Sequence, residues 1–213
     1  MSATLGVTRT STDSTIRRCC DVTSVLWIPS QWMRVGIFDH FGWAVAVTAN
    51  SSHDVVDRRR IELVEPGLTP APIHYDGDPA DVAGTAALVA RVRASVARST
   101  ARALEDLSAS LPEAVQSFSL RAWPADFPED MVVRLRPPYE ARADAIMYRT
   151  ILASAADERG WIVCPYSAKD VEAQAAAILG DRADDVLNGP RRRLGPPWTK
   201  DHRIALAATV VCG

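Results

Sequence analysis

Two acidic side chains stand where they could take part in metal-dependent chemistry. Asp39 directly follows the apolar run Val35–Phe38, Asp201 opens the last helical segment, and His40 and His202 come immediately after them. Hydrolysis of a phosphodiester by two Mg²⁺ ions needs several carboxylates that converge on sites ~3.5–4 Å apart, and a histidine can bind metal or carry a proton. Asp39, Asp201 and His202 are therefore candidates for such catalysis, and the two aspartates are candidate metal ligands.

The same residue types also have structural uses. Asp39 could simply favour a turn by bonding its own backbone. Asp201 could be a helix N-terminal charge, which the helix dipole stabilises by ~0.3–1 kcal/mol. Glu62, on a strand of alternating character, is a third candidate metal ligand. The residues alone leave the catalytic and the structural interpretations open.

A basic cluster lies near the carboxyl end of the chain. It comprises Arg191, Arg192 and Arg193, with Lys200 and Arg203 nearby, and Trp198 stands among them. Such a cluster can contact phosphate, and a tryptophan can stack on a base. The alternative interpretation is a solvated loop.

The elements that must position these residues follow from the periodicity of apolar residues. Three short strands joined by tight turns, Val35–Phe38, Trp43–Thr48 and Arg58–Val64, predict an antiparallel meander, with Gly42 at positive φ in its first turn. Helices and strands then alternate: Asp81–Leu111, Val115–Trp123, Tyr139–Arg159, Trp161–Tyr166, Ala168–Leu179 and Lys200–Val211, with irregular stretches at Pro66–Pro79, Pro124–Pro138 and Gly189–Trp198. This order predicts an α/β fold with a mixed five-stranded sheet and helices on both faces.

Composition narrows the classes of protein. The chain has 213 residues, 47% of them hydrophobic, and a formal net charge of −2, so any nucleic-acid binding needs a local patch. No apolar run approaches the ~20 residues that span a bilayer. The sequence has no Gly-x-Ser-x-Gly, Walker-type or Gly-x-Gly-x-x-Gly motif, which argues against common hydrolases, NTPases and dinucleotide enzymes.

The four cysteines have no CxxC spacing, so we predict neither a disulfide framework nor a zinc site. Cys164 is interpreted as a small buried hydrophobe, and a reducing cytoplasm as the location. Residues 1–32 are rich in Ser and Thr and lack periodicity. We expect either that they are a disordered extension or that Met33 is the natural start, and the alternative is an ordered arm along the domain surface. Residues 33–213 are expected to form one domain.

This element order resembles that of the ribonuclease H-like superfamily. The segment Val35–Val47 is similar to the opening hairpin of that superfamily, whose first strand delivers an Asp before a Gly turn. The segment Asp201–Ala207, together with Pro165 and Lys169, is similar to the bacterial Holliday-junction resolvases, in which a strand ends in Pro, a Lys follows, and the chain closes on a helix with an acidic start.

The resemblance implies action on nucleic acid, Mg²⁺ as cofactor, Asp39 and Asp201 as metal ligands, and Lys169 with the basic cluster as phosphate contacts. Two positions depart from the pattern: Ser119–Trp123 offers no carboxylate near the fourth strand, and Ile204 replaces a second Asp on the final helix. We therefore expect a divergent ribonuclease H-like protein that acts on nucleic acid. It is either a Mg²⁺-dependent nuclease or a catalytically inactive binding or assembly module, and a homodimer is left open.

Overall fold

The computed structural model describes residues 32–213. The expectations for the first 31 residues, an extension and a start at Met33, lie outside the described residues. Within the described part, β1 (Met33–Asp39), β2 (Trp43–Ala49), β3 (Val55–Glu62), β4 (Val115–Arg121) and β5 (Ile162–Tyr166) form one sheet in the order β3-β2-β1-β4-β5. β1 pairs antiparallel with β2 and β2 with β3, whereas β4 runs parallel to both β1 and β5.

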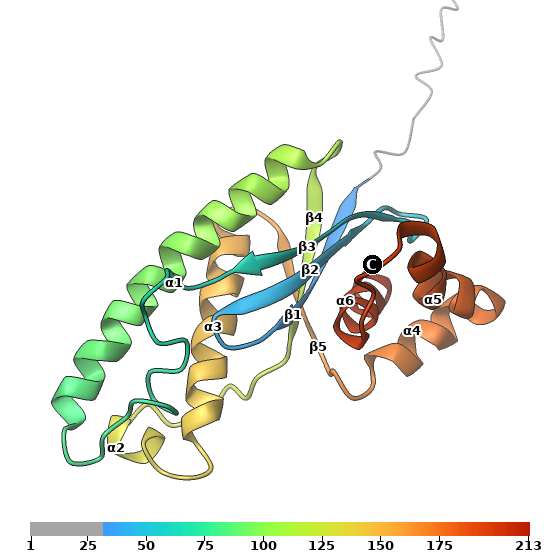
Figure 1. Ribbon diagram of the computed structural model, residues 1–213. Coiled ribbons are helices and arrows are strands. Elements are labelled where there is room, and N and C mark those ends of the chain that lie inside the picture. The colour runs from blue at the N-terminus through green and yellow to red at the C-terminus, as the bar shows by residue number, and fades with distance from the viewer. Residues whose placement is uncertain (1–31) are drawn as a thin grey trace, which may run out of the picture. The chain divides into compact units, whose positions relative to one another are not determined.

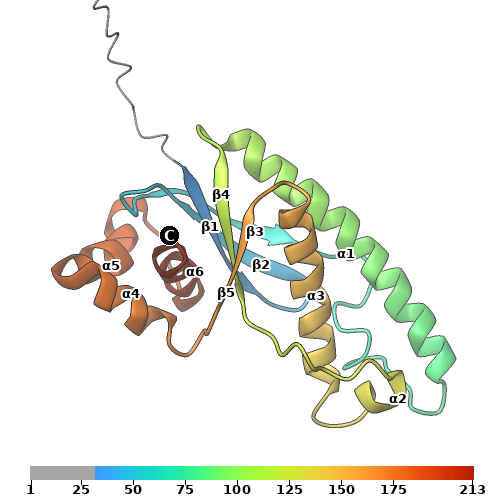
Figure 2. The same cartoon turned by 180° about the vertical axis from the view of Figure 1, so that it is seen from behind.

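Helices cover both faces of the sheet (Figure 1). α1 (Val82–Ser110), the short α2 (Met131–Arg134) and α3 (Glu140–Asp157) lie on one face. α4 (Val171–Leu179), α5 (Ala183–Leu194) and α6 (Lys200–Val211) lie on the other, as the reverse view also shows (Figure 2). The predicted α/β sheet with helices on both faces is therefore confirmed.

Two hydrophobic cores follow from the alternation of strand residues. Val35 and Ile37 of β1 pack under α1 and α3, while Val45 and Val47 of β2 pack against α4, α5 and α6. Gly36 allows α6 to approach the sheet closely, because a Cβ atom there would lie 1.9 Å from the carbonyl oxygen of Ala205. The sheet and α6 are thus fixed against each other at the middle of β1.

The apolar periodicity of the sequence predicted the bounds of most strands and helices to within a few residues. The turn after β1 does place Gly42 at φ 80°. The third strand begins and ends earlier than expected, at Val55–Glu62. The interpretation of Gly189–Trp198 as irregular is wrong in its first half, since α5 continues through Gly189 and Pro190 to Leu194 despite two residues that disfavour helix interiors.

The cysteine interpretation also needs correction. Cys164 on β5 and Cys212, just after α6, form a disulfide, so Cys164 is not a free hydrophobe. Spacing in the sequence could not indicate this pair, because only the packed positions of β5 and α6 bring the two sulfur atoms together. In the described part of the chain, no helix is both long and apolar enough to cross a membrane. Cytoplasmic location stays a prediction.

Candidate functional site

Asp39 ends β1 and is almost fully buried, with 2% of its surface exposed. Its carboxylate accepts hydrogen bonds from Arg121, Nε to Oδ1 at 2.7 Å and Nη2 to Oδ2 at 2.7 Å, and from Arg149 Nε to Oδ2 at 3.0 Å. Nη2 of Arg121 also donates to the backbone carbonyl of Asp39, and its guanidinium covers the Phe38 ring at 4.5 Å. One buried carboxylate is therefore held by two guanidinium groups.

The fold explains how these three side chains meet. Alternation along β1 puts Asp39 on the face of Val35 and Ile37, which α3 covers, and Arg149 lies on α3. β4 runs parallel to β1, so Arg121 at the end of β4 reaches the same edge of the sheet. Burial works to lower the pKa of Arg121, but its hydrogen bonds to Asp39 and the charge of Asp39 outweigh this. The pKa therefore lies above its ordinary value and the side chain stays cationic.

The predicted metal ligands do not converge. Asp39 pairs with Ala44 of β2, and Ala44 pairs with Ile61 of β3, so these three side chains share one face of the sheet. Glu62 follows Ile61 and therefore points to the other face, and β3 lies two strand spacings, about 10 Å, from β1. Asp201 is the second residue of α6, which also covers that other face. Glu62 is exposed and pairs with Arg60 at 2.5 Å.

A two-metal site therefore does not fit the side chains that are present. Between residues 32 and 213, no three His, Cys, Asp or Glu side chains come close enough to hold a metal ion. Both oxygens of Asp39 already accept hydrogen bonds from cationic groups, which repel a further cation. Magnesium binding by Asp39, Asp201 and Glu62 stays a prediction, without a donor set of the expected kind behind it.

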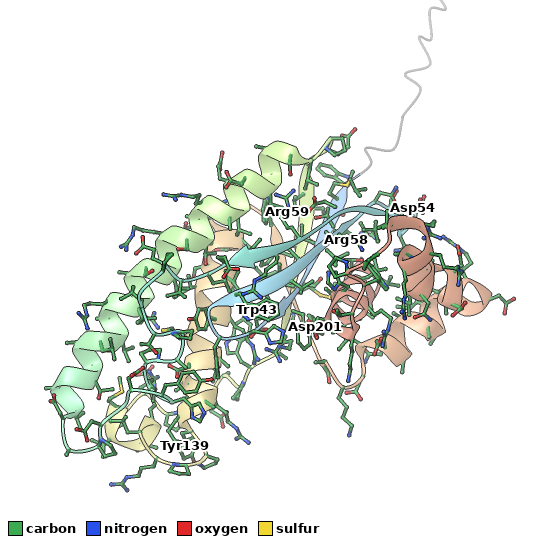
Figure 3. All side chains as sticks on the ribbon, in the orientation of Figure 1. Trp43, Asp54, Arg58, Arg59, Tyr139 and Asp201 are labelled. Atoms are coloured by element: carbon green, nitrogen blue, oxygen red, sulfur yellow. A yellow bond between two sulfur atoms is a disulfide. The ribbon has the colours of Figure 1, made fainter. Side chains whose placement is uncertain are left out.

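Asp201 instead contacts His40, which stacks with Trp43 and Arg60 beside the end of β1. His40 Nε2 lies 3.0 Å from Asp201 Oδ2, and the His40 ring stacks on Trp43 with centroids 4.0 Å apart and planes at 12°. On Trp43 lies the Arg60 guanidinium, 3.9 Å from the ring centroid. Figure 3 shows Trp43 and Asp201 near each other, and both line a cavity of about 290 Å³. His40 thus links the first turn to α6.

His202 and Trp198 have structural roles. His202 caps α6, because its Nδ1 accepts a hydrogen bond from the Thr199 backbone at 3.3 Å. Burial lowers the pKa of His202 and the nearby Arg58 lowers it further, which favours the neutral ring. Trp198 is 8% exposed and donates from Nε1 to the Leu187 carbonyl at 3.1 Å. The predicted stacking of Trp198 on a base does not fit this burial.

The predicted phosphate contacts are at the surface but fall in two places. Arg191, Arg192 and Arg193 are exposed on α5, where Arg193 pairs with Asp185 at 3.1 Å and Arg192 lies 4.0 Å from the same carboxylate. Lys169 follows the end of β5 and Lys200 begins α6, and both are exposed. The two lysines thus share the sheet edge with Asp39, whereas the arginines form a separate surface.

A cavity opens directly over the Asp39 cluster. It measures about 370 Å³ and is lined by Phe38, Asp39, His40, Phe41, Arg121, Ala145 and Arg149. A second hollow of about 340 Å³ shares Ala145 and Arg149 and adds Arg142. We call the two together the β1 edge groove. Its three arginines exceed its one aspartate by two charges, so it favours anions.

The groove also has free donors. Nη1 of Arg121 and Nη2 of Arg149 make no hydrogen bond within residues 32–213. The other nitrogens of both guanidinium groups do make hydrogen bonds, and the longest of these joins Arg149 Nη1 to the Ala122 carbonyl oxygen at 3.3 Å. The sequence showed only that the segment Ser119–Trp123, which contains Arg121, has no carboxylate where the resemblance expects one. That absence was the one available signal, because the sequence left the role of Arg149 on its predicted helix open.

The strand order and directions confirm the predicted mixed five-stranded α/β sheet and are consistent with a ribonuclease H-like fold. No family model and no curated protein matches the sequence. Among solved structures, RuvC of Thermus thermophilus in complex with a Holliday junction substrate aligns with a TM-score of 0.45 and 14% identity over 84% of this chain and 91% of that chain. A second structure of Thermus thermophilus RuvC gives 0.44 and 13% over 84% and 92%.

Proposed function

We propose that this domain binds nucleic acid through the phosphates of its backbone at the β1 edge groove and does not cut it with metal ions. This is the binding-module alternative of the two that the sequence leaves open. The observation that carries it is the engagement of the Asp39 carboxylate by Arg121 and Arg149. A ribonuclease H-like nuclease needs a free carboxylate at that place, and here it serves as the counter-ion of two arginines.

Charge supports anion binding rather than cation binding. A Mg²⁺ ion at Asp39 would have to displace two guanidinium groups whose nitrogens lie 2.7 to 3.0 Å from the carboxylate oxygens. A phosphate meets the opposite situation, because Arg121 and Arg149 each keep one amino group without a partner in the described part of the chain. Guanidinium groups bind phosphate oxygens with charge-assisted hydrogen bonds, which are among the stronger ones in proteins.

Neighbouring cations extend this surface. Arg142 lines the groove, is exposed and has no ion pair within residues 32–213. Lys169 and Lys200 stand at the same sheet edge, and the α5 arginines offer further contacts along a longer ligand. Because the whole chain carries a net charge of −2, binding depends on this local surface and should weaken steeply as salt is raised.

The test combines binding and cleavage on the full-length protein. Fluorescence anisotropy would measure the affinity for single-stranded DNA, RNA and branched DNA at two salt concentrations. Arg142→Ala should weaken binding and reduce the slope of log K against log salt by about 0.7 to 0.9, the value for one phosphate contact. Arg91→Ala is the matched control, since Arg91 is exposed on α1 and lines no part of the groove.

Cleavage of the same substrates is assayed in Mg²⁺ or Mn²⁺ beside Asp39→Asn. We expect no cleavage that depends on Asp39. Cleavage by the native protein that the Asp39→Asn variant loses would overturn the proposal in favour of the nuclease. Failure to bind any nucleic acid, or equal effects of Arg142→Ala and Arg91→Ala, would overturn the binding function itself.

A further inference from the structure

We propose that the ligand of the β1 edge groove is a single strand, whose bases stack on an aromatic surface beside the arginines. This inference rests on the proposed function, and it adds the class of nucleic acid. The surface consists of Phe41, His74 and Tyr75, which we call the aromatic shelf. Phe41 lies in the turn between β1 and β2, and the other two lie in the loop between β3 and α1.

The shelf and the arginine cavity are continuous. Phe41 lines the cavity that contains Arg121 and Arg149. The Tyr75 ring meets Phe41 edge-on, with centroids 6.2 Å apart and planes at 87°, and lies 5.1 Å from His74. His74 is also 6.2 Å from Phe41. Phosphate donors and stacking surfaces therefore adjoin each other, as in proteins that track a single strand.

Tyr75 is exposed on a firmly held loop. Its side chain is 63% exposed, the largest exposure among the big hydrophobic side chains of residues 32–213. The loop beneath it is tied to α3, because Asp144 accepts hydrogen bonds from the backbone of His74 at 2.9 Å and of Ile73 at 3.2 Å. Tyr75 N also donates to Ala71 O at 2.9 Å. An aromatic ring kept in water by an ordered backbone is arranged for contact with a flat apolar partner.

Charge orients the strand. Asp76 follows Tyr75 and is exposed, and its negative charge repels phosphate from the shelf. Arg121, Arg149 and Arg142 attract phosphate to the groove, which Phe41 also lines. Bases then point toward Phe41 and Tyr75, which requires that they be unpaired and unstacked. In a duplex the faces of the bases are already covered by their neighbours, so the shelf selects single strands.

The experiment compares three ligands of equal length: an oligothymidylate, the same strand made wholly of abasic sites, and the corresponding duplex. Tyr75→Ala should weaken binding of the oligothymidylate about tenfold, which is a typical effect for loss of one stacking partner. Tyr75→Phe should restore it, because Phe keeps the ring. Trp32→Ala is the matched control, as Trp32 is 43% exposed but precedes β1, at the opposite end from Asp39.

Stacking gives a second, spectroscopic readout. A strand that carries 2-aminopurine should lose fluorescence on binding the native protein, and lose less with Tyr75→Ala. The abasic strand should bind more weakly than oligothymidylate and should not respond to Tyr75→Ala. If Tyr75→Ala weakens the abasic strand or the duplex as much as the oligothymidylate, or weakens none, the single-strand inference is wrong, even when Arg142→Ala still reduces binding. If the native protein binds none of the ligands, the proposed function fails with it.

Discussion

Replacing Asp39 by Asn distinguishes an arginine counter-ion from a metal ligand through stability alone. The substitution keeps the shape of the side chain but removes the charge that holds Arg121 and Arg149, and its amide group turns one acceptor oxygen into a donor. Removing one partner of a buried ion pair typically costs about 3–5 kcal/mol, because the remaining charge is left uncompensated. Arg121 and Arg149 are 24% and 13% exposed, so water offsets part of this loss. We expect the lower end, about 3 kcal/mol.

Urea unfolding followed by circular dichroism would measure the change in the free energy of unfolding. For a protein of this size about 3 kcal/mol corresponds to a fall of about 6–12 °C in the melting temperature. Asp57→Asn is a suitable control, because Asp57 binds a single arginine, Arg59, at 2.7 Å and is 23% exposed. That substitution should cost less than about 1 kcal/mol. The reasoning is refuted if the Asp39→Asn variant is as stable as the native protein or more stable. Higher stability is the result expected at a metal site, where the substitution relieves repulsion between clustered carboxylates.

Three further predictions concern the scaffold and its titration. Gly36→Ala should lower the free energy of unfolding by about 3 kcal/mol, measured in urea, since the new Cβ would lie 1.9 Å from the Ala205 oxygen and force α6 away from the sheet. Cys212→Ser should cost about 4 kcal/mol under oxidising conditions, from the chain entropy of a cross-link between residues 48 apart, and dithiothreitol should reproduce that loss in the native protein. Burial raises the pKa of Asp144 to about 6 from 3.8. Between these pH values the native state therefore holds the proton on Asp144 more tightly than the unfolded state does. The contribution of Asp144 to the free energy of unfolding falls as pH rises through this range. Asp144→Asn should therefore gain stability relative to the native protein between pH 4 and pH 7, as urea unfolding at both values would show.

Each of these predictions has an outcome that contradicts it. If the Gly36→Ala variant unfolds at the same urea concentration as the native protein, the close packing of α6 on β1 is wrong. A stability of the native protein that dithiothreitol leaves unchanged would mean that the cross-link contributes nothing. For Asp144, a constant difference between variant and native protein at both pH values would show that its carboxyl group titrates alike in the folded and unfolded chains.

Most elements could be predicted from the sequence because their signals are local. Asp81–Leu111 has apolar residues at helical spacing, and the structure places α1 at Val82–Ser110. The last helix was predicted with the bounds it has, Lys200–Val211. α5 was missed because Gly189 and Pro190 oppose a helix locally, whereas its packing through Val186 and Leu187 into the core that α4 and α6 share supports it.

Local sequence signals were sufficient to predict most strands and helices in their order, with α5 missed, and to place Asp39 at the end of the first strand. They also showed that no carboxylate stands at the end of the fourth strand. These depend on residues near one another in the chain. The tertiary structure alone decided which partners Asp39 has, that Asp201 and Glu62 belong with the opposite face, that Trp198 is buried and that Cys164 meets Cys212. Such facts depend on register and packing between segments far apart in sequence: Arg121 and Arg149 reach Asp39 across 82 and 110 residues.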